Sequence, residues 1–244
     1  MARYARLVVA AVAVLLVAPG VVDAAGRRPP RNAFQLRFGG FFPSGGGPLW
    51  TDVQDRFTLD AGDMDGEVFG VSYVSSLSNT WEVGVNADFY QETVLSAEED
   101  FVDEDGFAIY HDTELDETPV SVDVRFLPGG RYRERPGGVR VLKPVVYLGA
   151  SAGINFWEYD EIGDFVDDSD PNDPFVFSDH YSEEGEAFQY GVLAGVELPV
   201  QPSFHILFEG RYTWADDSLD GDLAFLDSIE LGGASAFFGM SFRF

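Results

Sequence analysis

Hydrophobic and polar residues alternate in steps of two along the last segment of the chain, residues 229–244. One face of this segment carries Ala234, Ala236, Phe238, Met240, Phe242 and Phe244. The other face carries Ser235, Phe237, Gly239, Ser241 and Arg243. A period of two predicts a β-strand with one apolar face. Because chain ends are usually polar and frayed, we expect this aromatic-ended strand to be buried, and we expect lipid to cover it.

Seven earlier segments show the same alternation and are predicted to be strands. They lie near residues 34–42, 67–77, 81–90, 120–126, 146–156, 188–198 and 204–214. The connections between the eight strands alternate in length, with long loops at 44–66, 94–117, 158–186 and 215–230 and shorter turns at 78–80, 128–140 and 201–203. Short turns at one end and long loops at the other are typical of outer-membrane barrels. The pattern therefore predicts an all-β fold, an antiparallel up-and-down transmembrane β-barrel of about eight strands.

The second face of the predicted strands is polar and charged. Its charged positions are Arg37, Glu82, Asp88, Asp123, Arg125, Glu197, Glu209, Arg211 and Arg243. Inside a membrane barrel, these side chains would form a paired polar network in the lumen. Periodicity alone also fits a soluble lipocalin-like ligand binder with its polar face outside. Aromatic residues favour the membrane barrel, since two interfacial girdles are expected from Trp81 and Phe126 at one end and Phe42, Phe89, Phe156 and Trp214 at the other.

The first 24 residues resemble a secretion signal. Arg3 and Arg6 precede an apolar run over residues 7–18, and Val22-Asp23-Ala24 offers small residues at the spacing of a cleavage site. The alternative, a helical membrane anchor, needs a longer run. We therefore expect a signal peptide at 1–24, a basic leader at 25–31 and one barrel domain at 32–244.

Charge is distributed unevenly along the chain. The 42 acidic and 15 basic residues give a net charge of −27, which argues against a nucleic-acid partner. Most of the acids lie in the four long loops, where Arg56 is the only lysine or arginine. Bases gather in the leader and the 128–140 turn, at Arg27, Arg28, Arg31, Arg131, Arg133, Arg135, Arg140 and nearby Lys143. The two ends of the barrel are thus predicted to differ in charge.

The ending Gly239-Met240-Ser241-Phe242-Arg243-Phe244 resembles the C-terminal insertion signal of outer-membrane proteins, with Gly239, Phe242 and Phe244 as its marked positions. Over residues 32–244 the strand plan resembles the small eight-stranded outer-membrane barrels, the OmpW-like and OmpA-barrel-like proteins. The resemblance implies a bacterial outer-membrane location, long loops outside and termini in the periplasm. It also implies contact with outer-membrane lipid and lipopolysaccharide, and delivery by the barrel-assembly machinery through the C-terminal strand. It implies no particular activity and no oligomeric state.

The acidic loops contain fragments that resemble calcium loops. The candidate ligands are Asp63, Asp65, Asp103, Asp105, Asp168 and Asp170. None of these fragments has the full EF-hand spacing with its closing Glu. The simpler interpretation is a solvated, mutually repelling surface that recruits Ca²⁺ or Mg²⁺ loosely next to anionic lipopolysaccharide. No resident cofactor is expected.

Catalytic chemistry is not expected from the three histidines. His205 shares a strand face with Glu209 but has no neighbouring nucleophile, and no partner serine is evident for His111 or His180. Two non-enzymatic hypotheses remain, a structural or surface-interaction barrel and a narrow OmpW-like channel for small solutes. Eight strands usually leave a lumen just filled by side chains, which favours the first.

Overall fold

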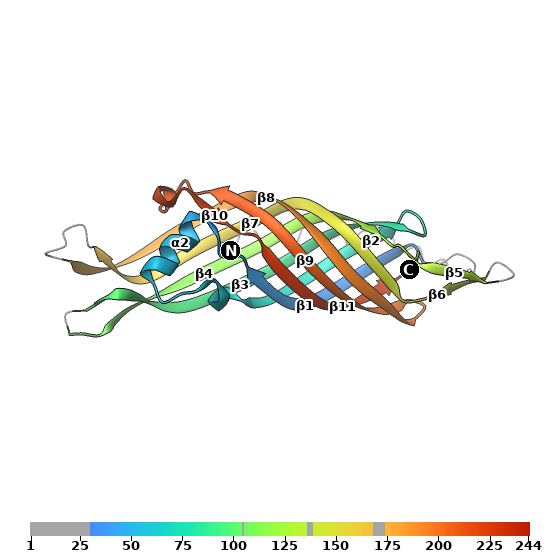
Figure 1. The fold of residues 1–244 in the computed structure, drawn as a ribbon, viewed down its shortest axis with the longest axis horizontal. Helices are drawn as coiled ribbons and strands as arrows, with labels where there is room; N and C mark the ends of the chain where they lie inside the picture. The colour runs from blue at the N-terminus through green and yellow to red at the C-terminus, as the bar shows by residue number, and fades with distance from the viewer. Residues whose placement is uncertain (1–29, 104, 136–138, 168–173) are drawn as a thin grey trace.

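Strands dominate the computed structural model, which describes residues 30–103, 105–135, 139–167 and 174–244. The predicted signal peptide and most of the predicted leader lie outside these residues. The barrel strands are β1 (Asn32–Pro43), β2 (Gly66–Ser76), β3 (Trp81–Val102), β4 (Ala108–Phe126), β7 (Val145–Asp167), β8 (Phe175–Gln201), β9 (Phe204–Ser218) and β11 (Gly233–Arg243). Each pairs antiparallel with its neighbours in the order β1-β2-β3-β4-β7-β8-β9-β11, and β11 pairs with β1. In the described chain these eight strands therefore form a closed ring, which confirms the predicted fold (Figure 1).

Smaller elements lie at the two ends of the barrel. One end carries the helix α2 (Gly47–Arg56), the short 3₁₀ helices η1 (Ala61–Met64) and η2 (Ala224–Leu226), and the strand β10 (Ser228–Glu230). The other end carries the C-terminus and the small hairpin of β5 (Tyr132–Arg135) and β6 (Val139–Leu142) (Figure 1). No helix among the described residues is long and apolar enough to span a bilayer.

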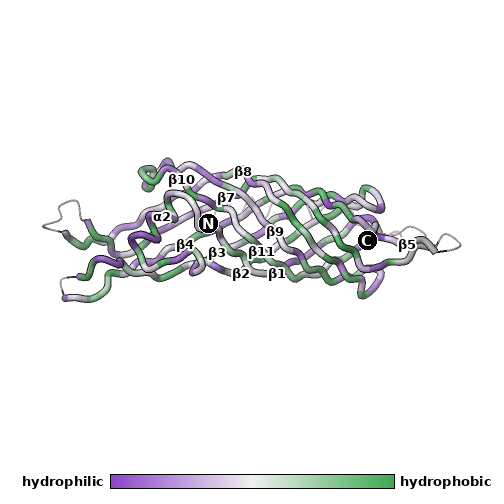
Figure 2. The backbone as a smooth tube through the Cα atoms, viewed as in Figure 1, coloured by the Kyte–Doolittle hydropathy of each residue, from purple (hydrophilic) through white to green (hydrophobic). Residues whose placement is uncertain are grey.

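The outer wall of the barrel is apolar, and the inner wall is polar. Phe38, Val122 and Phe188 are 49%, 50% and 63% exposed, whereas Arg37, Asp123 and Gln189 next to them in sequence are buried. Hydrophobic positions recur along the barrel strands in Figure 2. This is the reverse of a soluble barrel, so the lipocalin-like alternative does not fit.

The predicted long loops are largely structured, and this part of the prediction was wrong. β3 and β4 continue pairing up to Val102 and Ala108, and β7 and β8 continue to Asp167 and Phe175. Backbone ladders need no apolar face, so the strands run on where alternation of hydrophobic residues stops. The 44–66 segment contains α2 and η1, and the 128–140 turn contains the β5–β6 hairpin.

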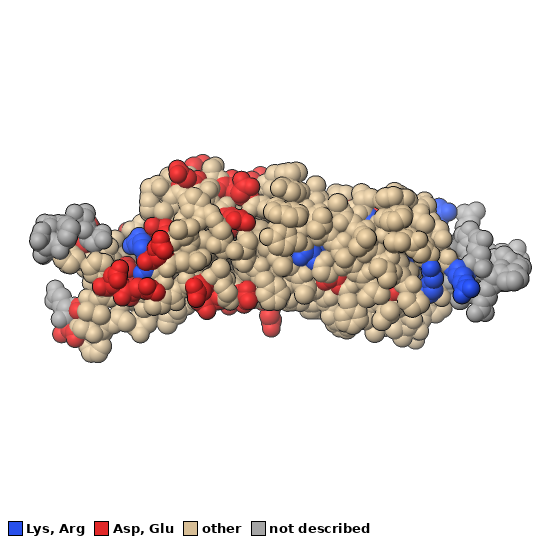
Figure 3. Space-filling model, viewed as in Figure 1, with Lys and Arg blue, Asp and Glu red and all other residues tan. Residues whose placement is uncertain are grey.

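Charge separates along the long axis of the molecule. Figure 3 shows acidic groups gathered at the end that carries α2, basic groups at the opposite end, and few charges on the wall between them. Trp81 and Phe126 lie side by side on the wall near the basic end, with ring centroids 5.0 Å apart. Phe42 and Trp214 are exposed toward the acidic end.

Candidate functional site: the filled lumen and the acidic mouth

The middle of the lumen holds a network of arginine–carboxylate pairs. Arg37 on β1 donates to Glu209 on β9 at 2.7 Å and to Asp88 on β3 at 2.6 Å. Arg211 donates to Glu209 at 2.6 Å, and Arg125 donates to Asp123 at 2.8 Å. Charged groups removed from water need such partners to be tolerated.

Two glycines make room for this network. A side chain at Gly70 would collide with Asp88 and crowd the Arg37 guanidinium, and one at Gly84 would collide with Asp123. Each glycine lies directly opposite the carboxylate on the neighbouring strand. The polar inner face and these gaps together allow long arginines to lie across the barrel.

A second layer of charged groups fills the lumen toward the β5–β6 hairpin. Arg131 forms a bidentate pair with Glu82, at 2.7 and 2.6 Å, and Arg243 forms one with Glu197, at 2.7 and 3.0 Å. His205 places Nδ1 2.6 Å from Glu197. All five side chains are buried, so this layer closes the end of the barrel near the chain terminus.

The structure brings all nine residues of the sequence-predicted lumen network inside the barrel, in these two layers. Arg131 was missed, because its position among the bases of the 128–140 segment suggested an exposed turn. The charge count could have indicated a missing base, since the nine predicted residues comprise five carboxylates and only four arginines. With Arg131 the two layers hold five of each.

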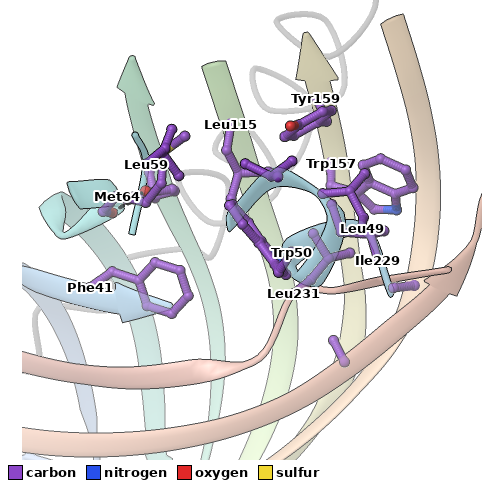
Figure 4. Close-up of a cluster of buried hydrophobic side chains, with 14 of the residues drawn as sticks. Phe41, Leu49, Trp50, Leu59, Met64, Leu115, Trp157, Tyr159, Ile229 and Leu231 are labelled. Atoms are coloured by element: carbon purple, nitrogen blue, oxygen red, sulfur yellow. Dashed lines mark hydrogen bonds between the residues drawn. The ribbon is translucent and has the colours of Figure 1, made fainter. Parts of the chain in front are cut away.

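The opposite end of the lumen is closed by an apolar cap. Leu49, Trp50 and Val53 form the buried face of α2, and Trp50 donates from Nε1 to the carbonyl of Glu230 at 2.9 Å. Figure 4 shows Leu49 and Trp50 among side chains of the surrounding strands, including Trp157 and Tyr159. The apolar cluster closes the lumen above the ion pairs.

Little free volume remains between the cap and the ion pairs. A cavity of about 30 Å³ lies there, lined by residues that include Phe41, Asp88, Glu117 and Arg211. This volume holds about one or two water molecules. Between the cap and the ion pairs, the described part of the lumen is therefore nearly filled by side chains.

A larger groove of about 520 Å³ opens beside the cap at the acidic end. α2, the extensions of β3, β7 and β8, and the segment around η2 form its walls. Its charged lining residues are Asp52, Asp55, Arg56, Glu98, Asp100, Glu161 and Asp167. Its apolar and aromatic lining residues are Phe101, Phe165, Val166, Phe177, Tyr181, Leu223, Phe225 and Leu226. The groove was not predictable from the sequence, because its walls come from four segments that the hydrophobic pattern marks only as separate loops.

His111 has a serine partner that sequence analysis did not find. The hydroxyl of Ser96 on β3 lies 3.0 Å from Nε2 of His111 on β4, and both side chains are buried. Burial and the nearby Arg56 charge lower the pKa of His111 to about 4. In the described structure Nδ1 has no hydrogen-bond partner, and Phe57 and Phe165 pack against the ring. The pair lacks an orienting acid and an exposed nucleophile, so its geometry is that of an internal contact.

The other two histidines also contact carboxylates. His180 lies 2.8 Å from Asp160 on the exposed β7–β8 extension, and His205 contacts Glu197 rather than the Glu209 noted from the sequence. In the described contacts of these two histidines, no serine, threonine or cysteine lies within hydrogen-bonding distance of the imidazole.

The candidate metal ligands have local backbone partners. Asp63 accepts from the backbone N–H of Asp60 at 2.8 Å, and Asp103 accepts from those of Asp105 and Phe107 at 3.0 and 2.7 Å. Asp65 is the C-cap residue of η1, while Asp168 and Asp170 lie outside the described residues. Within the described ranges, no group of three or more His, Asp or Glu side chains is arranged to hold a metal ion. Metal binding by the loops stays a prediction.

The residues of the predicted insertion signal lie on the strand that closes the ring. β11 pairs with β1 on one side and β9 on the other. Phe242 and Phe244 are exposed on the outer wall, and Gly239 faces the lumen beside Leu207 and Arg37. Their role in insertion stays a prediction.

A closed antiparallel barrel with an apolar outer wall and paired charges inside is a transmembrane β-barrel. No family model and no curated protein matches the sequence. Similar solved structures include Neisserial surface protein A, with a TM-score of 0.49 and 11% identity over 87% of this chain and 96% of that chain. OprG from Pseudomonas aeruginosa has a TM-score of 0.49 and 9% identity over 90% and 98%. A major outer membrane protein from Thermus thermophilus has a TM-score of 0.48 and 13% identity over 87% and 99%. At these low identities and TM-scores, the similar structures do not indicate a function for this chain.

Proposed function

We propose that this chain is a non-enzymatic bacterial outer-membrane barrel of the structural or surface-interaction type. The filled lumen is the observation that carries the proposal. Two ion-pair layers and an apolar cap occupy the space that a channel would need, and the cavity described between the cap and the ion pairs has a volume of about 30 Å³. What the molecule offers to its surroundings is therefore its outer surface, above all the acidic end.

In this proposal the acidic end faces the outside of the cell and the termini lie in the periplasm. The connections between strands are longer at the acidic end than at the end that carries the termini. This difference supports the orientation, since outer-membrane barrels have short periplasmic turns. The apolar wall contacts lipid, and the acidic extensions lie next to lipopolysaccharide. The closing strand β11, with its aromatic end, is the segment offered to the barrel-assembly machinery.

Membrane fractionation of cells, followed by protease treatment of intact cells, tests location and orientation. The protein is expected in the outer-membrane fraction and to shift in mobility when boiled in SDS. External protease is expected to cut the β3–β4 or β7–β8 extension and to spare the β5–β6 hairpin. A soluble periplasmic protein, or cleavage at β5–β6 from outside, contradicts the proposal.

Loose recruitment of Ca²⁺ or Mg²⁺ by the acidic extensions is part of the proposal. Burial and the like charges of Glu114 and Glu158 raise the pKa of Asp116 to about 6. Such repulsion is reduced by counter-ions. Chelator is expected to speed protease digestion of the extensions, whereas unchanged digestion and circular dichroism rule out specific calcium sites.

A further inference from the structure

The groove beside α2 combines a negative rim with an aromatic wall. Among its lining residues, six carboxylates face the single base Arg56, and five aromatic rings line the same space. Phe225 is 67% exposed although it is a large aromatic residue on a short helical turn. Concave sites of 300–1,000 Å³ with apolar walls and a few charged groups are typical of small-ligand binding.

Arg56 shows how this groove accommodates an organic cation. Its guanidinium lies 3.7 Å from Asp52 and 3.7 Å from Glu98. The same group lies over the ring of Phe57, 5.1 Å from the centroid. A guanidinium is thus held by carboxylates and an aromatic face together, a combination that favours cations with an apolar neighbour.

One arginine does not balance the charge of the groove. Asp55 and Asp100 are exposed at its rim, on α2 and on the β3 extension. Glu161 is buried in its wall, where burial raises the pKa of its carboxyl group. A second positive charge entering the groove would be attracted by the exposed carboxylates of Asp55 and Asp100.

We propose that this groove binds a small organic cation that carries an aromatic or aliphatic body, such as a guanidinium or amine compound. The cation lies between the rim carboxylates, and the apolar body packs against Phe101, Phe177 and Phe225. The inference rests on the proposed function in one respect, that the acidic end faces the medium.

The test uses the full-length protein in nanodiscs and isothermal titration calorimetry at low ionic strength. The probe is N-acetyl-phenylalanyl-arginine amide, which has one guanidinium and one aromatic ring. Its matched partner contains citrulline in place of arginine, with the same shape and no charge. The arginine probe is expected to bind at least about tenfold more tightly than the citrulline probe, as expected for loss of one attractive charge.

Variants locate the binding site. The double variant Asp55→Asn/Asp100→Asn and the single variant Phe225→Ala are each expected to weaken binding about five- to tenfold. Arg56→Gln is expected to tighten binding by a similar factor, because it removes the resident cation. Asp112→Asn is the control, since Asp112 is exposed on the outer face of β4 and does not line the groove. Its affinity is expected to stay within about twofold of the wild-type value.

Three results would overturn the inference. They are no heat of binding with the arginine probe, equal affinity for the citrulline probe, or equal weakening in Asp112→Asn and the groove variants. Boiling-dependent gel mobility of every variant confirms that the barrel is folded. Gel mobility, fractionation and conductance are measured without the probe. A protein that passes these three tests but does not bind the probe therefore contradicts the groove inference and leaves the barrel assignment intact.

Discussion

Single charged side chains inside the barrel depend on partners from distant parts of the sequence. Arg131, just before β5, contacts Glu82 on β3 and Glu197 on β8. It is also the lumen residue that periodicity could not place, because it lies outside any alternating segment. The other nine were predictable because a strand sends every second side chain to the same face.

Replacing Arg131 is expected to destabilise the barrel. Arg131→Ala leaves Glu82 buried without its bidentate partner, at a cost of about 3–5 kcal/mol. The measurement is the free energy of unfolding in detergent micelles by urea titration. Arg133→Ala, at an exposed neighbour, is the control.

Adding Glu82→Gln to Arg131→Ala is expected to recover part of the loss, because the unpaired charge is then gone. If Arg131→Ala is no less stable than Arg133→Ala, the second ion-pair layer, toward the β5–β6 hairpin, does not exist as described.

His111 predicts a pH dependence of the β3–β4 extension. Burial first, and Arg56 second, lower its pKa from 6.5 to about 4. Because the pKa of His111 is lower in the folded form, the unfolded form binds a proton between pH 6.5 and 4 that the folded form does not bind. Stability is therefore unaffected above pH 6.5 and falls as the pH drops from 6.5 toward 4.

Hydrogen exchange of residues 94–113 measures this effect. Wild-type protein is expected to open more readily at about pH 4.5 than at about pH 7.5, two values that lie on either side of an ordinary histidine pKa. His111→Gln is expected to lose much of that difference, and the remainder comes from carboxylates that also titrate in this range. Identical pH profiles for the two proteins would show that His111 does not titrate in this way.

At the scale of elements, the helix α2 acts as a cap on the barrel. Its buried face Leu49, Trp50 and Val53 has the spacing of one helical stripe, and Pro48 lies in the first turn, where proline is tolerated. Glycine and aspartate on both sides suggested a loop. A ten-residue helix gains most of its stability from packing, which the sequence alone does not display.

Strand ends were hard to predict for a related reason. Loss of apolar alternation near Val94 and Glu158 marks the place where the outer wall stops being continuously apolar. The hydrogen-bond ladder continues beyond that point, as the β7–β8 pairing from Glu158 to Asp167 shows. Periodicity therefore located the part of each strand with an apolar outer face and missed the extensions that build the groove.

Trp50→Ala is expected to release the cap. The substitution removes a fully buried indole and its bond to the Glu230 carbonyl, at about 3–5 kcal/mol. Limited proteolysis within residues 44–66 is expected to become faster. Thr51→Ala, at the exposed neighbouring position, is expected to behave as wild type. Equal protease resistance of the two variants would mean that α2 is not held by this contact.

At the scale of the whole molecule, the barrel separates three environments. The wall is apolar, the lumen is filled by balanced charges, and the acidic mouth carries a groove. The closed ring and its two faces followed from the sequence, since they depend on alternation along each strand. The cap and the groove did not, since they depend on how distant segments meet at one end.

Planar-bilayer conductance tests the filled lumen most directly. Protein shown to be folded by its boiling-dependent gel mobility is added to the membrane, and a porin of known conductance is the positive control. The structure predicts no resolved single-channel current for the wild type, and none for Trp50→Ala, whose ion-pair layers remain. Reproducible current steps from the folded wild-type protein would contradict a closed barrel and would favour the narrow channel.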